Sequence, residues 1–343
     1  MNADTSTNAN ASMNASATPA LTPAFEAQGL RAYKVPGASA TVETIIATTP
    51  ETRAICNDPD VRGVDYTRRL QAACSRILKH MPGRAFGEAE AVVVNILRGG
   101  LNFGLRGAVA DAFGWNRHTT CFISAQRARD AASPEDWHIT ENDYKKLYFP
   151  PVAAFLLGDI VATGTSLRYG MSELVSAAQR IGTDLRTFIF FTIGGMKTVE
   201  IFSKLDAQCR QIFPNYKKTT VVFLEGIFTV AEIQTPLTIR LTGTDLVRLG
   251  ALMAPEFVES QYASPAYPIE RCAIYDAGSR AFHLDEYESD VAGYWKQTLK
   301  LAERGMTFEA LVRERFPELD PARFGDVDLK ELSLAQIAKF ETL

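Results

Sequence analysis

Apolar residues form a nearly continuous run over 155–161, and a helical pattern of apolar positions follows over 166–181. A short apolar run that passes through Gly into positions spaced 3.6 apart is typical of a buried strand, a turn and a helix. The joining loop consists of small and hydroxyl-bearing residues: Ala162, Thr163, Gly164, Thr165 and Ser166. The pattern therefore predicts a strand–loop–helix unit.

The same alternation recurs along most of the chain. A β-branched run over 91–97 predicts a second buried strand, which passes through Arg98, Gly99 and Gly100 into a predicted helix over 102–113. Further strands are predicted over 119–124, 186–193 and 219–224, with shorter ones over 239–241 and 271–275. Further helices are predicted over 65–80, 199–213 and 245–253. Alternating strands and helices predict an α/β fold: a mainly parallel twisted sheet with helices on both faces.

The predicted elements divide the chain into three parts. Residues 1–24 are rich in Asn, Ala, Ser and Thr, which predicts a disordered tail. Residues 25–284 form the α/β domain, which carries a polar lid over 125–149 and an insert over 230–270. At its start the pattern is weak, with one apolar stretch near 42–46.

The third part, residues 285–343, is predicted as a helical C-terminal extension. Helical periodicity covers 291–303, 308–316 and 334–340. The apolar faces of these helices need a partner, which is either the main domain or another subunit.

The composition excludes several classes of function. With 343 residues, 46% of them hydrophobic, the chain can bury a sizeable core. Its formal net charge of -4 argues against a general affinity for nucleic acid or anionic membranes. The five scattered cysteines lack metal-binding spacing, which indicates buried thiols in a reducing compartment. No stretch looks able to span a bilayer and no targeting signal stands out, so we expect a cytoplasmic protein.

The loop over 162–166 has chemistry that suits an anion. Its backbone N–H groups and the start of the following helix can bind phosphate, and its three hydroxyls can donate hydrogen bonds. Asp159, just upstream, suits the hydroxyls of a sugar or a metal on the same ligand. Arg98 and Asp159 both end predicted parallel strands, where ligands bind in open α/β sheets, so we expect them to share a site. A turn whose Thr and Ser only cap the helix would have the same composition, so these residues alone leave both interpretations open.

Four stretches resemble, in chain order, segments of the type I phosphoribosyltransferases, and most closely those of uracil phosphoribosyltransferase. They are residues 95–101, Arg129-Asp130, residues 158–166 and residues 275–282, with shorter matches at 66–70 and 225–226. The similarity covers roughly residues 54 to 282.

The resemblance implies an enzyme that transfers ribose 5-phosphate from 5-phosphoribosyl 1-diphosphate to a nitrogenous base, uracil or a related heterocycle, and releases pyrophosphate. Arg98, Gly99 and Gly100 would hold the pyrophosphate, and Arg129 would close over it from the lid. The loop 162–166 would seat the 5′-phosphate while Asp159 orients the ribose hydroxyls.

The resemblance also implies a base pocket, a cofactor and an assembly. The pocket would be formed by Tyr275, Asp276, Ala277 and Gly278, whose turn would present backbone groups to the base. Mg²⁺ would bridge pyrophosphate and ribose oxygens, with a shell made mostly of water and substrate. We expect a homodimer.

Departures from the family pattern keep other functions open. Gly158 precedes Asp159 where the uracil enzymes carry Asp-Pro and the purine and orotate enzymes carry two acids. Ala162 stands where purine enzymes place a general base, and Ser279 replaces an acid of the base loop. A non-catalytic regulator or RNA-binding module that senses the activated sugar is one alternative. An enzyme that acts on a non-uracil acceptor is another.

Overall fold

The structure is a computed structural model that describes residues 20–97, 99–129, 137–141, 144–232, 234–241 and 243–341. For residues 126–129, 137–138 and 140–141 it describes the backbone alone. Most of the predicted tail, residues 1–19, and part of the predicted lid lie outside the described residues.

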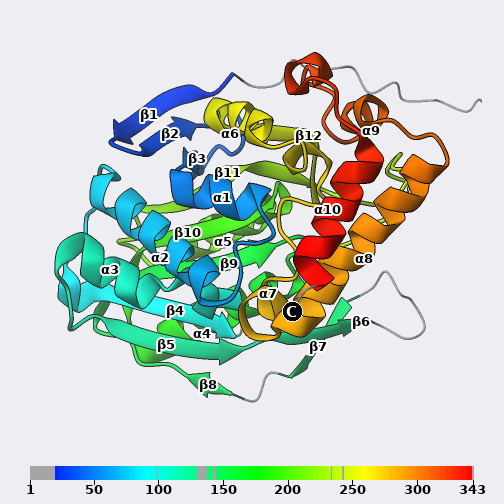
Figure 1. Ribbon diagram of the computed structural model, residues 1–343. Helices are drawn as coiled ribbons and strands as arrows, with labels where there is room; N and C mark the ends of the chain where they lie inside the picture. Colours follow the sequence, from blue (N-terminus) through cyan, green and yellow to red (C-terminus); the bar gives the residue numbers. More distant parts are fainter. Residues whose placement is uncertain are drawn as a thin grey trace, which may run out of the picture.

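A large sheet forms the centre of the protein (Figure 1). Its strands lie in the order β1-β2-β3-β11-β10-β9-β4-β5-β8, and β12 also pairs with β11. The six strands from β3 to β5 run parallel, whereas β1, β2, β8 and β12 join by antiparallel pairing. The strands of this sheet are β1 (Thr22–Ala27), β2 (Leu30–Lys34), β3 (Val42–Thr48), β4 (Ala91–Leu97), β5 (Thr119–Ser124), β8 (Lys145–Lys146), β9 (Val152–Val161), β10 (Asp184–Gly195), β11 (Lys218–Val230) and β12 (Leu246–Met253). A separate ribbon pairs β6 (Gln126–Arg129) with β7 (Trp137–Glu141).

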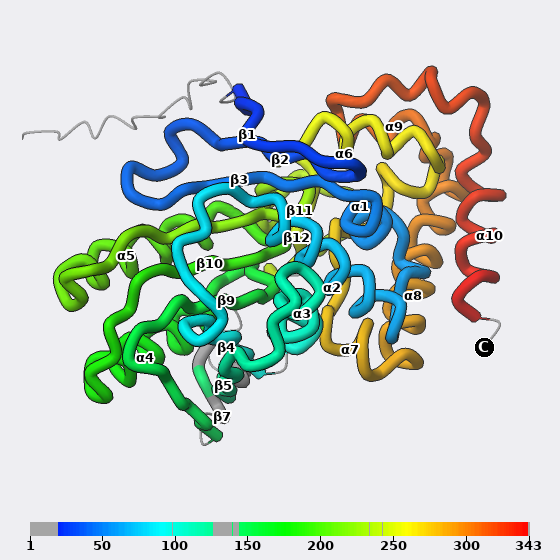
Figure 2. The backbone as a smooth tube through the Cα atoms, turned by 90° about the vertical axis from the view of Figure 1, so that its left-hand side faces the viewer, coloured from blue at the N-terminus to red at the C-terminus, as the bar shows by residue number. Residues whose placement is uncertain are grey.

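Helices cover both faces of the sheet. They are α1 (Pro50–Asn57), α2 (Gly63–His80), α3 (Leu105–Phe113), α4 (Thr165–Ile181), α5 (Lys197–Ile212), α6 (Pro255–Ser260), α7 (Ala277–Phe282), α8 (Leu284–Glu303), α9 (Phe308–Arg315) and α10 (Leu329–Glu341). Short 3-10 helices are η1 (Glu88–Glu90), η2 (Gly99–Phe103), η3 (Gln261–Ala263), η4 (Tyr267–Ile269) and η5 (Pro321–Phe324). Figure 2 shows α4 and α5 on one face, and α1, α2 and α3 on the other. Because both faces are covered, β9 and β10 are buried along most of their length, and their central residues are mainly apolar rather than alternating.

The order of the parallel strands reverses between β4 and β9. From β4 the chain crosses through α3 to β5, toward one edge of the sheet. From β9 it crosses through α4 to β10 and through α5 to β11, toward the other edge. The crossover loops after β4 and β9 therefore diverge, and such a switch point leaves a crevice at the carboxyl ends of the two strands.

The mainly parallel sheet predicted from the sequence is confirmed, and so are its five central strands. The segment 245–253, predicted as a helix, is instead the strand β12, because it pairs with the bulged end of β11. The short strands predicted over 239–241 and 271–275 are not strands. Whether a short apolar run becomes a helix, a strand or a loop depends on which backbone lies beside it, and local pattern does not report that.

The N-terminal region holds more structure than its weak pattern predicted. β1 begins at Thr22, within the segment predicted as a tail, and turns through Gly29 into β2. Gly29 has a φ of 69°, which suits this tight hairpin. Helix α1 begins with a capping box between Thr49 and Thr52 and has Pro50 in its first turn. These are recognised helix-start signals, so α1 could have been predicted.

A second hydrophobic core joins the C-terminal helices to the insert. The helices predicted over 291–303, 308–316 and 334–340 are confirmed as parts of α8, α9 and α10 (Figure 1). Their buried apolar residues cluster with residues on the other side of the predicted boundary at 284: Ile239, Ala266, Ile269, Cys272 and Tyr275. The apolar faces of these helices thus find their partner within the same chain.

The described residues include no helix that is both long and apolar enough to cross a bilayer. All five cysteines are free and buried, as their scattered spacing predicted. Burial raises the pKa of each thiol above its ordinary value, so these groups are neutral packing residues rather than nucleophiles.

Glu225 is a buried carboxyl group within β11 that anchors α1. Its φ of 68° lies in the left-handed region, which is rare for a residue with a side chain. Its Oε1 accepts hydrogen bonds from the backbone N–H of Thr49, at 3.1 Å, and from the hydroxyl of Thr52. Burial raises the pKa of Glu225 to about 7, although these hydrogen bonds oppose the shift.

The burial of Glu225 predicts that stability falls as the pH rises from about 5 to about 8. Its pKa of about 7 in the folded protein exceeds the ordinary value of 4.5, so over this interval the folded state retains a proton that the unfolded state releases. This contribution is fully present below pH 4.5 and is lost as the pH passes through 7. Urea unfolding should show a decrease of roughly 3 kcal/mol. Glu225→Gln should remove that decrease, and an equal decrease in the variant would contradict the role given to Glu225.

Candidate functional site

Two adjoining pockets, the narrow lobe and the wide lobe of one site, lie at the switch point beyond the carboxyl ends of β4 and β9. The narrow lobe has a volume of about 140 Å³, and its walls include Leu97, Gly164, Thr165 and Ser166. The wide lobe has a volume of about 300 Å³ and is lined in part by Ala162, Asp245, Arg271, Tyr275 and Gly278. Gly99, Asp159 and Ile160 line both lobes. The cavity therefore brings together the ends of two neighbouring strands and a turn more than 100 residues further along the chain.

The turn after β4 packs directly against the end of β9. A methyl group added at Gly99 would overlap Oδ1 of Asp159, so only glycine allows this approach. At Gly100 an added Cβ would lie 3.2 Å from the carbonyl oxygen of Gly158, which is also a tight contact. Gly99 thus brings backbone against the acidic residue of the neighbouring strand, and Gly100 brings it against the residue before that acid.

Asp159 is half-buried where the two lobes meet, and its Oδ1 accepts a hydrogen bond from the N–H of Ile160 at 2.9 Å. The structure also explains why Gly158 precedes it. A side chain at Gly158 would overlap the fully buried ring of Phe103, which belongs to the turn after β4. The single acid at this position is therefore a consequence of how the β4 turn packs.

The loop after β9 leads into α4 with its first-turn N–H groups at the narrow lobe. Gly164 precedes the helix with a φ of 74°, and no described side chain caps the helix start. Thr165 and Ser166 are half-buried in the lobe wall, and the Oγ1 atoms of Thr163 and Thr165 are 3.4 Å apart. The first four N–H groups of a helix have no partner within it and carry partial positive charge. The narrow lobe therefore has the donors and the potential that suit an anion.

The turn at the start of α7 forms the floor of the wide lobe. Oδ1 of Asp276 accepts hydrogen bonds from the N–H groups of Gly278 and Ser279, both at 2.8 Å. The carbonyl oxygen of Ala277 accepts one from Nδ2 of Asn102, at 2.9 Å. The N–H groups of Gly278 and Ser279 are thus paired within the protein, whereas the carbonyl oxygen of Ala277 keeps a second lone pair that a ligand could use. Asp276 holds the turn in shape.

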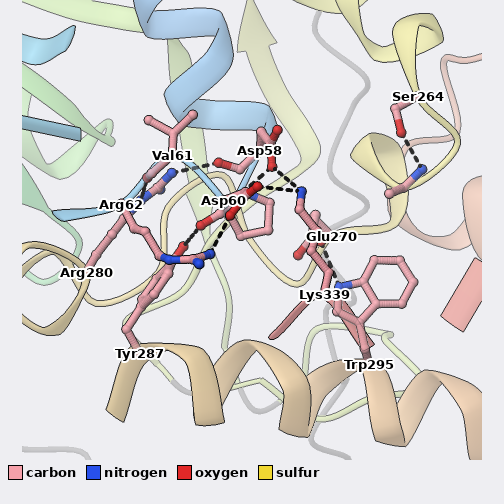
Figure 3. Close-up of polar contacts among 12 residues, drawn as sticks. Asp58, Asp60, Val61, Arg62, Ser264, Glu270, Arg280, Tyr287, Trp295 and Lys339 are labelled. Carbon is pink, nitrogen blue, oxygen red and sulfur yellow. Dashed lines mark hydrogen bonds and ion pairs between the residues drawn. The ribbon is translucent and has the colours of Figure 1, made fainter. Parts of the chain in front are cut away.

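A buried arginine, which we did not predict as part of the site, fixes α7 in place. Arg280 is 1% exposed and donates to the carbonyl oxygens of Val61, at 2.7 Å, and Asp58, at 2.8 Å (Figure 3). Its guanidinium also lies over the rings of Tyr66 and Tyr287, with 4.9 Å and 5.7 Å to their centroids. The sequence did carry a signal, because Arg280 belongs to the stretch 275–282 that resembles a base pocket.

A carboxyl group of the second core supports the same turn from the other side. Glu270 is buried and accepts hydrogen bonds from the hydroxyl of Tyr275, at 2.6 Å, and from Nε1 of Trp295 on α8, at 2.8 Å. Figure 3 shows the Trp295 contact. Burial raises the pKa of Glu270, although both hydrogen bonds oppose the shift. Tyr275 lines the wide lobe, so α8 contributes to the shape of the site through Glu270.

Two predicted site residues have side chains outside the described part of the structure. Arg98 lies outside the described residues, and Arg129 is described only as backbone within β6. The other predicted residues lie at or beside the cavity: Gly99, Gly100, Asp159, Ala162, Thr163, Gly164, Thr165, Ser166, Tyr275, Asp276, Ala277 and Gly278.

No family model matches the chain, and no curated protein matches it. Among solved structures, a hypoxanthine-guanine phosphoribosyltransferase from Bacillus anthracis is similar to 37% of this chain, over 69% of its own length, with 18% identity and a TM-score of 0.26. A hypoxanthine phosphoribosyltransferase from Staphylococcus aureus is similar to 42% of this chain, over 62% of its own length, with 15% identity and a TM-score of 0.24. TM-scores this low do not establish a shared fold.

The hydrogen bonds of Arg280 predict a large loss of stability when they are removed. Arg280→Ala leaves the buried carbonyl oxygen of Val61 without this donor and removes one of the two donors to the carbonyl oxygen of Asp58, which also accepts from the N–H of Val61. The loss should lower the free energy of unfolding by roughly 2–4 kcal/mol. Arg280→Lys should restore only part of this loss, because one ammonium group cannot reproduce the planar fork. Urea unfolding measures both, with Arg304→Ala at an exposed position as the control. A loss no larger than that of the control would contradict the anchoring role.

Proposed function

We propose that this protein is a phosphoribosyltransferase, which transfers ribose 5-phosphate from 5-phosphoribosyl 1-diphosphate to a ring nitrogen of a base. The observation that carries the proposal is the two-lobed cavity at the switch point, with the carboxylate of Asp159 where the lobes meet. Uracil or a related heterocycle is the acceptor that the resemblance in the sequence implies.

The cavity supports a definite placement of the substrate. The narrow lobe seats the 5′-phosphate against the N–H groups of the first turn of α4 and the hydroxyls of Thr165 and Ser166. Asp159 accepts hydrogen bonds from the ribose hydroxyls. The wide lobe then receives C1′ and the base, and the leaving pyrophosphate lies toward the turn of Gly99 and Gly100. Arg98 and Arg129 are assigned to the pyrophosphate by the resemblance alone.

The reaction breaks the bond between C1′ and the pyrophosphate oxygen, and the electron pair leaves with the pyrophosphate. A ring nitrogen of the base donates its lone pair to C1′, and where that nitrogen carries a proton, the proton passes to solvent. The ribose becomes cationic in between, so a nearby carboxylate such as Asp159 stabilises it while donors stabilise the leaving group. Electrostatic stabilisation, rather than a covalent nucleophile, is the chemistry that this site offers.

Magnesium is the cofactor that such a substrate calls for. The described residues contain no group of three or more His, Cys, Asp or Glu side chains arranged to hold a metal, so substrate oxygens would have to complete its shell beside Asp159. When bound, Mg²⁺ supplies charge neutralisation to the pyrophosphate.

A regulator that binds the activated sugar without transferring it is the second candidate. The overlap of Phe103 with any side chain at position 158 favours it, because this packing limits the sugar-binding strand end to one acid. Calorimetry distinguishes the two. Binding of 5-phosphoribosyl 1-diphosphate without pyrophosphate release across pyrimidines, purines and other nitrogen heterocycles would identify the regulator.

Removal of the charge at residue 159 tests the proposed enzyme. Asp159→Asn keeps the size of the side chain but removes the carboxylate that faces the cationic ribose, so kcat for pyrophosphate release should fall roughly 100-fold. The matched control is Asp326→Asn, whose carboxylate is exposed in the C-terminal extension and lines neither lobe. If Asp159→Asn keeps the activity of the unaltered protein, the site is wrongly assigned.

A methyl group at residue 99 tests the geometry rather than the charge. In Gly99→Ala the new methyl overlaps Oδ1 of Asp159 and must displace that carboxylate, so kcat/KM should fall roughly 100-fold although no polar group is lost. Gly87→Ala is the control, because nothing lies within 4 Å of a Cβ at that position. Equal kinetics in the two variants would show that the contact between the β4 turn and Asp159 is not needed.

A further inference from the structure

The wall of the wide lobe contains charged residues that the sequence did not assign to a site. Thr244 and Asp245 come from the loop before β12, and Arg271 follows η4. The first two belong to the predicted insert, and Arg271 comes directly after it. Together with Tyr275 they form a part of the lobe wall that comes from later in the chain than the β4 and β9 loops.

Arg271 is held from three directions. Its Nη2 is 3.1 Å from Oδ1 of Asp245, and its Nη1 is 2.6 Å from Oδ1 of Asp290 on α8. Its guanidinium carbon lies 4.8 Å from the centroid of the Tyr275 ring. The guanidinium is thus already paired with two carboxylates, and this group of three charged residues carries a net charge of -1.

This ion pair is poorly exposed to water. The side chain of Asp245 is 5% exposed and that of Arg271 is 17% exposed, so water screens their charges weakly. Arg271 is the only cation among the described residues that line the wide lobe, whereas Asp159, Asp245 and Asp276 are acids. A ligand carboxylate here would meet the negative charge of Asp245 and would have to compete with Asp245 and Asp290 for the two Nη atoms of Arg271. The Nε atom has no partner among the described residues, but it is buried. A ligand N–H group meets carboxylate and hydroxyl oxygens that can accept its hydrogen bond.

We infer that the acceptor of the proposed reaction is a neutral nitrogen heterocycle with N–H donors, and that Asp245 and Arg271 exclude bases that carry a carboxylate. The inference rests on the proposed function and adds the chemical class of the second substrate. It also gives the insert a role, because the insert supplies the acidic residue that selects the acceptor.

Two pairs of acceptors that differ by one carboxylate test the inference: uracil with orotate, and nicotinamide with nicotinate. Initial rates of pyrophosphate release are measured with the full chain, Mg²⁺ and 5-phosphoribosyl 1-diphosphate. The neutral member of at least one pair should have a kcat/KM at least tenfold above that of its carboxylated partner. A carboxylated member that is used equally well or better overturns the inference and leaves the proposed function standing.

The variant Asp245→Asn tests the residue itself. It should reduce the discrimination within the active pair at least threefold by changing KM for the base, while KM for the activated sugar stays the same. A merely structural role would change both constants together. Asp326→Asn again serves as the control, and an unchanged discrimination in Asp245→Asn overturns the role of this residue. If the variant does not fold, the comparison of the pairs on the unaltered chain still decides the acceptor class.

The remaining outcomes bear on both proposals and are separated by calorimetry. If 5-phosphoribosyl 1-diphosphate binds and neither a base of these pairs nor a purine releases pyrophosphate, the inference and the transfer reaction are overturned but the sugar site stands. If the activated sugar does not bind, the proposed function is overturned as well.

Discussion

The contact between the β4 turn and the carboxylate of Asp159 is the constraint on which the rest of the site depends. Neighbouring parallel strands whose connections diverge at a switch point leave a crevice. Here the two loops also approach closely, so that residues of both line the same two pockets. Gly99 permits that approach, because any larger residue would overlap Asp159. Phe103, from the same turn, then fills the space beside Gly158 and leaves Asp159 as the acid at this strand end. One packing arrangement thus sets both the shape of the cavity and its charge.

The C-terminal helices have two roles, because they cover the insert and support the wall of the cavity. They share a core with Ile239, Ala266, Ile269, Cys272 and Tyr275, and Tyr275 also lines the wide lobe. Trp295 reaches Tyr275 through Glu270, and Asp290 holds Arg271 from α8. Arg280 connects the same region to the loop before α2. The extension is therefore part of the structure that shapes the site and not a separate appendage.

The sequence was most informative where function depends on local chain geometry. The strand ends at Leu97 and Val161, the glycines after β4 and the hydroxyl-rich loop before α4 all have local signatures, and parallel pairing brings them to one edge. Asp245 and Arg271 could not be found in this way, because their nearness depends on β12 pairing with β11 and on the packing of α8. The segment of β12 was predicted as a helix because its pairing with β11 is a tertiary interaction, which the local pattern does not contain.

The most direct test of the account is a crystal structure of the protein with 5-phosphoribosyl 1-diphosphate and Mg²⁺. The account predicts the 5′-phosphate in the narrow lobe, within hydrogen-bonding distance of the backbone N–H groups of residues 163–166, and the ribose hydroxyls beside Asp159. A basic groove of about 410 Å³ between α4 and α5, lined by Arg168, Lys197 and Lys204, is the competing anion site. A ligand bound there, with the cavity at the switch point making no contact to it, would contradict the central claim.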